Sequence, residues 1–267
     1  MPVAQNTLAN QPTDAPLLNQ VTDYWTQRAL GYSQHNQQEL ASQSQQKWQQ
    51  MLLSQLPNQL ATQRPLTIVD MGTGPGFMAI LMAQAGHRVI GVDATTEMLQ
   101  QAQQNALAQQ VQIEWLQGDV QQLPLADESV DCVISRNLTW NLQNPAQAYA
   151  EWYRVLKKGG TLINFDANWY LYLFDKSHEK GFLADRANTA RLQIEDHYAN
   201  TDTRAMEAIA RQLPLSQQAR PAWDKAQLRQ LGFMQIEVDL QINQKLLTQV
   251  EQINYRSTPM FMIVAKK

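Results

Sequence analysis

The sequence reads Ile68-Val69-Asp70-Met71-Gly72-Thr73-Gly74-Pro75-Gly76-Phe77 at the point that decides the fold. An apolar run that predicts a buried strand leads into a turn with glycine at three alternate positions, and the Ala/Leu/Met-rich segment 77–85 predicts a helix after it. Because glycine has no Cβ, the backbone can bend sharply there and approach a ligand closely. The turn is therefore predicted to lie against a small molecule.

A second predicted strand, residues 89–93, ends in Asp93, about 20 residues after the first glycine of the turn. An acid at the carboxyl end of the second strand of an α/β sheet can accept both hydroxyls of a ribose. The predicted ligand is therefore a nucleoside. A dinucleotide-binding turn usually reads G-x-G-x-x-G, whereas the glycines here follow the order G-x-G-x-G.

This compact turn resembles motif I of the class I S-adenosylmethionine-dependent methyltransferases, and the resemblance covers residues 66–166. Residues 118–120 (Gly-Asp-Val) resemble the third-strand acid of that family, and residues 123–135 resemble its connecting segment and fourth strand. Residues 156–163 are similar to its helix-Gly-Gly-strand signature, with Lys158 where proline is common. The resemblance implies the fold and the cofactor, and it leaves the methyl acceptor open.

The fold class implied is α/β, a seven-stranded, mostly parallel Rossmann-like sheet with helices on both faces and a helical cap. Residues 1–16 are predicted to be a flexible tail and residues 17–56 an N-terminal helical cap of two helices, broken near Gly31. Residues 57–267 are predicted to form the methyltransferase domain, with a cap insertion at 167–225, since so long a connection is often a lid or binding element.

Further boundaries are expected within that domain. Asn144-Pro145 is a favourable helix start, and Gly159-Gly160 is expected to end the helix that follows. Residues 232–240 and 260–265 read as the last two strands, and the resemblance implies that both run antiparallel to the others. Cys132, the only cysteine, falls in a predicted buried strand.

Composition narrows the class of protein. The chain has 267 residues, a formal charge of −3 and a pI near 5.8, so a nucleic-acid partner is not expected. One cysteine cannot form an internal disulfide, which fits a reducing cytoplasm. No secretory signal is visible and no apolar run is long enough to span a membrane. The oligomeric state stays open.

The resemblance implies a cofactor site for S-adenosyl-L-methionine, with S-adenosylhomocysteine as product. Its turn and acids imply contacts from Asp70, Gly72, Thr73, Gly74, Gly76, Asp93, Ala94, Met98, Asp119 and Val120. Asp93 would accept from the ribose and Asp119 from the adenine amino group. Asp70 could instead cap the turn, and Met98 could serve only as core.

Two further cofactor contacts are expected outside the motifs. Residues 24–33 resemble the helix that closes over the cofactor in many relatives, so Arg28 and Tyr32 could reach its methionine end, Arg28 as a carboxylate partner. The aromatic residues there could instead only pack on the core. Asn137 follows the fourth strand, at the edge where catalytic loops lie in open α/β sheets, and is expected to contact cofactor or substrate.

Methyl transfer from a sulfonium is a direct displacement in which alignment supplies much of the rate enhancement and a base is optional. The catalytic candidates are Asn137, Tyr32, His178 and His197. The loop after the fourth strand carries no histidine, although many small-molecule methyltransferases have one there. No H-E-x-x-H or paired-cysteine spacing predicts a metal site.

Asn168, Trp169, Tyr170 and Tyr172 directly follow the fifth predicted strand, so they could line an acceptor pocket or pack under the insertion. The predicted function is methyl transfer to a small-molecule N, O or S nucleophile. A protein or RNA acceptor, a non-catalytic nucleoside-binding protein and a nicotinamide-dependent oxidoreductase are the alternatives.

Overall fold

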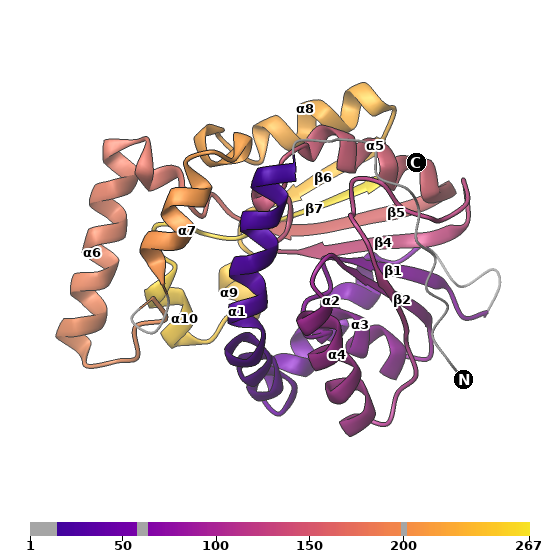
Figure 1. The fold of residues 1–267 in the computed structure, drawn as a ribbon, viewed down its shortest axis with the longest axis horizontal. Coiled ribbons are helices and arrows are strands. Elements are labelled where there is room, and N and C mark those ends of the chain that lie inside the picture. The colour runs from indigo at the N-terminus through magenta and orange to yellow at the C-terminus, as the bar shows by residue number, and fades with distance from the viewer. Residues whose placement is uncertain (1–14, 58–63, 199–201) are drawn as a thin grey trace.

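A single seven-stranded sheet in the order β3-β2-β1-β4-β5-β7-β6 runs through the centre of the computed structural model, which describes residues 15–57, 64–198 and 202–267 (Figure 1). Most of the predicted tail lies outside the described residues. The strands are β1 (Thr67–Met71), β2 (Arg88–Asp93), β3 (Glu114–Gln117), β4 (Val130–Arg136), β5 (Leu156–Asp166), β6 (Met234–Asp239) and β7 (Phe261–Lys266). The predicted fold class is confirmed.

Helices cover both faces of this sheet because alternate strand residues point to opposite sides. Ile68 and Cys132 join the hydrophobic cluster beneath α2 (Ser44–Gln55), α3 (Phe77–Gln84) and α9 (Ile242–Leu246). Their neighbours Val69 and Val133 join the cluster beneath α5 (Pro145–Val155) and α8 (Ala222–Leu231). α4 (Thr96–Ala108) packs against β2 and β3.

The remaining helices gather at one side of the sheet (Figure 1). They are α1 (Ala15–Leu40), α6 (Lys176–Leu192), α7 (Thr203–Ala210) and α10 (Gln249–Asn254). A third hydrophobic cluster joins Met206 and Ile209 of α7 to Val21 and Trp25 of α1 and to Trp140 after β4. α1 and the insertion are therefore fixed to each other by apolar packing.

The direction of β6 differs from the prediction. β7 pairs antiparallel with β5 and with β6, so β6 runs parallel to β1–β5 and only β7 is reversed. The chain reaches β6 through the helices of the insertion and then returns through α9 and α10, which places β7 between β5 and β6. The expectation of two antiparallel strands was therefore wrong for the sixth.

The predicted break at Gly31 was also wrong, since α1 continues through it to Leu40 and the chain turns at residues 41–43. A glycine inside a helix costs only about 1 kcal/mol relative to alanine, and α1 packs against α4, α2 and α7. At the true break, Ser42 Oγ donates to Glu39 O and accepts from Ser44 N.

Gly31→Ala is expected to raise the free energy of unfolding by about 0.5–1 kcal/mol, because a helix-interior glycine costs backbone entropy. The position has room for the methyl group: an added Cβ would meet only Arg28 Nη1, at 4.0 Å. Urea denaturation of both proteins checks this. An unchanged or lower unfolding free energy would mean that α1 is not helical at Gly31 in solution.

The helix predicted to end at Gly159-Gly160 ends earlier, at Val155, and both glycines lie inside β5. Leu156 pairs with Val130, and the register then shifts before Thr161 pairs with Cys132. Gly159 has φ +76°, and an added Cβ on Gly160 would lie 2.8 Å from Lys157 O. The two glycines therefore form an irregularity in the strand.

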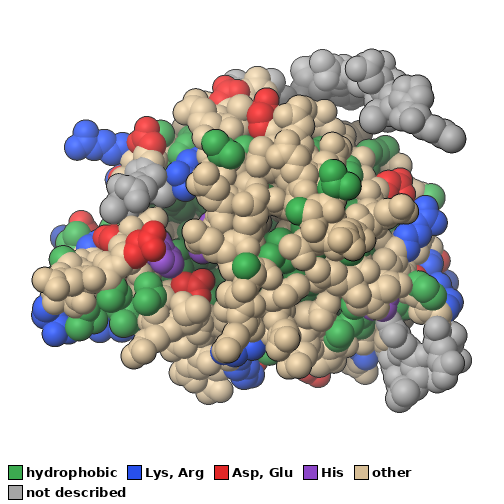
Figure 2. Space-filling view, turned by 90° about the horizontal axis from the view of Figure 1, so that it is seen from below, with side chains coloured by type: hydrophobic (Ala, Val, Ile, Leu, Met, Phe, Trp, Pro, Cys, Tyr) green, Lys and Arg blue, Asp and Glu red, His purple; other side chains and the backbone are tan. Residues whose placement is uncertain are grey.

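Among the described residues, no helix has the length and apolarity needed to cross a bilayer. The face in Figure 2 is mostly uncharged, with Lys and Arg side chains toward its margins and not in one continuous patch.

Candidate functional site

The turn between β1 and α3 adopts a backbone that needs its glycines. Gly72, Gly74 and Gly76 have φ of +61°, +51° and +90°. A Cβ on Gly72 would lie 2.5 Å from the Leu138 side chain, and one on Gly74 would lie 3.5 Å from the Tyr32 ring. The turn is thus packed closely on both sides.

Asp70, at the end of β1, fastens this turn. Its Oδ2 accepts from Thr73 Oγ1 at 2.6 Å and from the backbone N of Ala79 in α3 at 3.1 Å. Burial raises the pKa of its carboxyl from 3.8 to about 7, although both hydrogen bonds oppose the rise. Asp70 therefore does cap the turn, and it also lines the cleft beside it.

Asp70→Asn is expected to become more stable relative to the original chain as pH rises from about 4 to about 7. The folded carboxyl binds its proton more tightly than the unfolded one, whose pKa is 3.8. Ionisation therefore costs the folded state stability over that interval. The asparagine has no such cost, and its oxygen can still accept from Thr73 and Ala79.

Chemical denaturation of both proteins at pH 4.5, 6 and 8 measures this difference directly. Subtracting the two curves removes the contributions of groups that do not interact with Asp70. A difference in unfolding free energy that stays constant with pH would contradict the raised pKa of Asp70.

Asp93, at the end of β2, connects the glycine turn to the start of α4. Its Oδ2 accepts from Gly74 N and its Oδ1 from Thr95 N, both at 2.9 Å. Burial raises the pKa of its carboxyl. Each carboxylate oxygen can accept a second hydrogen bond, so Asp93 can hold a pair of hydroxyl groups while it keeps both backbone contacts.

The glycine turn, Asp70 and Asp93 line one cleft at the carboxyl edge of the sheet. It is lined by all the predicted cofactor residues except Gly76 and Arg28. Gly76 is the N-cap residue of α3, and a Cβ added there would lie 3.1 Å from Trp115 and 3.2 Å from Ala102. α1 covers the cleft with Leu17, Leu18, Val21, Thr22 and Trp25. The sequence analysis assigned no specific role to the first four of these residues.

Asn137 lies where the cleft meets a second cavity. Its φ is +57°, its backbone N donates to Phe165 O at 2.8 Å, and its carbonyl accepts from Trp140 Nε1 at 2.9 Å. Its amide also contacts the Tyr32 hydroxyl. Among the described residues its buried Oδ1 has no hydrogen-bond partner, so it could accept from a ligand.

The second cavity, called here the chamber, has a volume of about 610 Å³ and is lined by α1, α10 and the segments 169–170 and 195–198. Trp25, Tyr32, Arg136 and Asn137 line both the cleft and the chamber. The two cavities are therefore neighbours separated by these side chains.

A buried ion pair fixes the wall between them. The Arg136 guanidinium donates to both carboxylate oxygens of Glu39, at 2.7 and 3.1 Å, and lies over the Trp48 ring at 4.4 Å from its centroid. The carboxylate of Glu39 raises the pKa of Arg136, although burial alone lowers it. This pair joins α1 to the end of β4, and the sequence did not predict it.

The structure separates the two histidine candidates of the insertion. His178 lies in the first turn of α6 with its side chain 41% exposed, paired with Asp175, and lines neither cavity. His197 lines the chamber, with Nδ1 3.0 Å from the Tyr255 hydroxyl. Burial lowers the pKa of His197, and His35 lowers it further.

Of the four residues predicted to line an acceptor pocket, two line the chamber and two do not. Trp169 and Tyr170 line the chamber, as does Arg28. The Asn168 side chain instead accepts from Arg220 N and donates to Arg220 O, both at 3.0 Å. Tyr172 donates to Glu207 and stacks on Phe182. Asn168 and Tyr172 line neither cavity and hold the insertion together.

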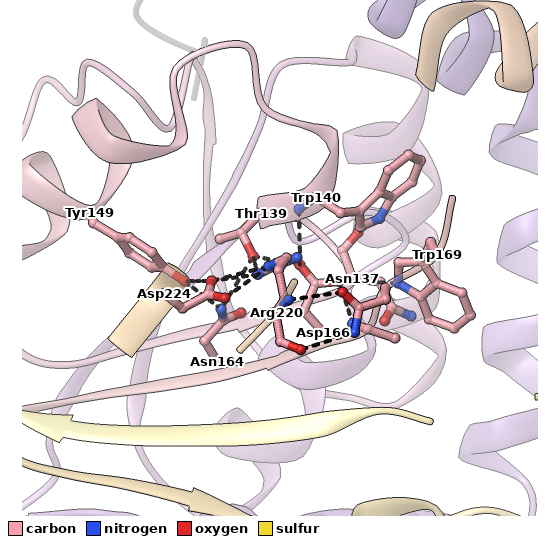
Figure 3. Close-up of polar contacts among 11 residues, drawn as sticks. Asn137, Thr139, Trp140, Tyr149, Asn164, Asp166, Trp169, Arg220 and Asp224 are labelled. Atoms are coloured by element: carbon pink, nitrogen blue, oxygen red, sulfur yellow. Dashed lines mark hydrogen bonds and ion pairs between the residues drawn. The ribbon is translucent and has the colours of Figure 1, made fainter. Parts of the chain in front are cut away.

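A buried polar network centred on Arg220 joins the insertion to the ends of β4 and β5 (Figure 3). The Arg220 guanidinium is fully buried and donates to Asp166 at 2.7 Å and to Asp224 at 2.6 Å. Thr139, Tyr149, Asn164 and Trp169 complete the network. Burial alone would lower the pKa of Arg220, but the carboxylates of Asp166 and Asp224 raise it by more, so the pKa is higher than usual.

Comparison with known proteins identifies matches over part of the chain. A family model described as a methyltransferase domain matches residues 69–164. An arsenite methyltransferase from Halobacterium salinarum is 42% identical over 106 residues, which cover 38% of this chain and 27% of that protein. A ubiquinone/menaquinone biosynthesis C-methyltransferase from Rubrivivax gelatinosus is 36% identical over 113 residues, covering 40% and 43%. The chain thus spans less than half the length of either relative.

Solved structures match over more of the chain. One is titled a putative S-adenosyl-L-methionine-dependent methyltransferase, from Methanococcus maripaludis, with 18% identity, TM-score 0.57 and coverage of 98% and 97%. Another is titled a possible histamine N-methyltransferase, from Thermotoga maritima, with 17% identity, TM-score 0.57 and coverage of 92% and 99%. At this identity the likeness shows the fold.

Proposed function

We propose that this chain, which belongs to the class I, Rossmann-like S-adenosylmethionine-dependent methyltransferases, transfers a methyl group to a small-molecule N, O or S nucleophile. One observation carries the proposal: a cleft that holds the glycine turn and Asp93 adjoins a larger chamber across Tyr32 and Asn137. A donor and an acceptor could therefore occupy neighbouring cavities.

The residues of the cleft fit the cofactor. Asp93 would accept from the ribose hydroxyls with the oxygen lone pairs that Gly74 and Thr95 leave available. The buried Oδ1 of Asn137 would accept from the ammonium group of the methionine portion. Gly72 also lines the cleft, and its lack of a Cβ lets Leu138 pack against the turn. When bound, S-adenosylmethionine supplies a methyl group on a positively charged sulfur.

The protein's task in such a displacement is alignment, which can supply several kcal/mol of the barrier. Tyr32 and Asn137 lie at the boundary of the two cavities and would position the reacting groups. α1 covers the cleft with apolar side chains and would exclude water. Arg136 and Glu39 would keep α1 in that position.

Calorimetric titration of the purified chain with S-adenosylmethionine, S-adenosylhomocysteine and NAD tests the proposal. We expect the first two to bind and NAD not to bind. Methyl transfer to a panel of thiols, amines and phenols then tests turnover. Binding of NAD alone would overturn the cofactor, and binding without transfer to any small molecule or macromolecule would favour a non-catalytic protein.

A further inference from the structure

The chamber is lined by charged and aromatic side chains that methyl transfer itself does not require. Among the residues that the structure describes, four with carboxylates (Glu39, Glu195, Asp196, Glu251) and two with guanidiniums (Arg28, Arg136) line it. Glu39 is paired with Arg136, and Asp196 with Arg186, which lies outside the lining. With Arg186 included, the described residues around the chamber carry four carboxylates and three guanidiniums, an excess of one negative charge.

Three polar groups converge in this chamber from two helices. One ligating atom each from His35, Glu39 and Glu251 lie within 4.8 Å of one another. His35 and Glu39 are four residues apart on α1, and Glu251 is on α10. Glu39 already binds Arg136, and Glu251 Oε2 accepts from Thr248 N and Oγ1 at 2.7 Å. Because the carboxylate oxygens of Glu39 and Glu251 already accept hydrogen bonds, they are poor ligands for a metal ion. Their charges still favour a larger organic cation.

Aromatic rings surround the same space. Ring contacts run from Trp25 to Tyr32, then to His35, His197, Tyr255 and finally Trp169, with centroid separations of 5.7, 6.4, 6.2, 5.5 and 5.5 Å. Tyr24, Tyr170 and Tyr198 also line the chamber. Faces of aromatic rings attract cations, most strongly where water is excluded.

We propose that the methyl acceptor is an amine that enters the chamber as its ammonium ion, held by Glu251 and by this series of rings. The inference rests on the proposed function and narrows its acceptor class. A thiolate, phenolate or carboxylate would bring a negative charge toward Glu195 and Glu251. An ammonium ion gains from both the carboxylates and the rings.

An ammonium nitrogen has no lone pair, so it must first lose a proton. His197 is placed to accept it, because its ring lies in the chamber and its Nδ1 interacts with the Tyr255 hydroxyl. The free amine then forms the N–C bond with the methyl group while the C–S bond breaks and the sulfur keeps the electron pair. The products are a methylammonium ion and a neutral thioether, and the imidazolium returns its proton to water.

Binding of two probes of the same shape tests the inference without turnover. 2-Phenylethylamine is an ammonium ion at pH 7, and 2-phenylethanol is its neutral counterpart. Each is titrated into the full chain saturated with S-adenosylhomocysteine, and heat and tryptophan fluorescence are recorded. We expect the amine to bind at least roughly tenfold more tightly. Equal affinities, or no binding of either probe, would overturn the inference.

Glu251→Gln should reduce the affinity for the amine to about that of the alcohol. Glutamine can replace glutamate in the capping box that begins α10, so the helix should form. The matched control is Glu237→Gln, which makes the same charge change on an exposed part of β6 outside the chamber. An equal effect of both variants would contradict a local role for Glu251. The comparison of the two probes on the original chain tests the inference even if neither variant folds.

Transfer of a labelled methyl group to primary amines, phenols and thiols separates this inference from the proposed function. Methylation of amines supports both. Methylation of phenols or thiols alone would overturn the amine assignment and keep the methyltransferase. Failure of S-adenosylmethionine and S-adenosylhomocysteine to bind would overturn the proposed function itself.

Discussion

Arg220→Met is expected to lower the free energy of unfolding by about 3–5 kcal/mol, because it leaves two carboxylates buried without their cation. Asp166, Asp224 and Arg220 all have fully buried side chains. The lost guanidinium also donates to Thr139 Oγ1 at 2.5 Å, so the ends of β4 and β5 lose a contact with the insertion. Methionine fills much of the volume, which limits the cavity left behind.

Thermal and urea denaturation measure the loss. Arg88→Met is the matched control, since Arg88 and Glu114 form an ion pair with side chains 71% and 58% exposed. Such pairs contribute little, and the control should change stability by less than about 0.5 kcal/mol. Adding Asp224→Asn to Arg220→Met should recover part of the loss, because one uncompensated charge is removed. Equal destabilisation by Arg220→Met and Arg88→Met would contradict the structural role of the network.

The core of the fold could be predicted because its signals are local. The run from Ile68 to Phe77 contains a strand, a turn that needs positive φ and the start of a helix, all within ten neighbouring residues. Asp93 could be assigned to the same edge because parallel strands end on one side of a sheet. The structure accordingly places both at the cleft.

The buried ion pairs could not be predicted in this way. Arg136 and Glu39 are 97 residues apart, and Arg220 and Asp166 are 54 apart. No spacing rule relates such partners, because their meeting depends on how α1 and the insertion pack. Arg220 and Asp224 are only four residues apart, but Arg220 precedes α8, so the i, i+4 rule for helix faces does not relate them either.

The same limit explains why His178 and His197 could not be distinguished. Both belong to the insertion, whose helices are placed by apolar contacts among α1, α7 and the residues after β4 and β5. Only that packing turns His197 toward Tyr255 and leaves His178 on an exposed helix start. The boundaries at Gly31 and Gly159 failed for a related reason: glycine permits a break, but packing and strand pairing decide whether one occurs.

Asp93→Ala is expected to weaken the binding of S-adenosylhomocysteine by about 1.5–3 kcal/mol, the usual range for hydrogen bonds to a charged group. The variant removes the carboxylate proposed to hold the ribose. It also releases Gly74 N and Thr95 N, so the glycine turn loses its contact with the start of α4. Asp93→Asn keeps one acceptor oxygen and should lose less affinity.

Calorimetric titration measures these affinities, and circular dichroism and melting temperature establish that each variant folds. Asp127→Ala is the control, since that carboxylate is 75% exposed, lies before β4 and is outside the cleft. Its affinity for S-adenosylhomocysteine should equal that of the original chain. If Asp93→Ala folds normally and binds as tightly as this control, the ribose is not held by Asp93. The cofactor would then have to be placed elsewhere, since the glycine turn and Asp93 are joined by a direct hydrogen bond and form one site.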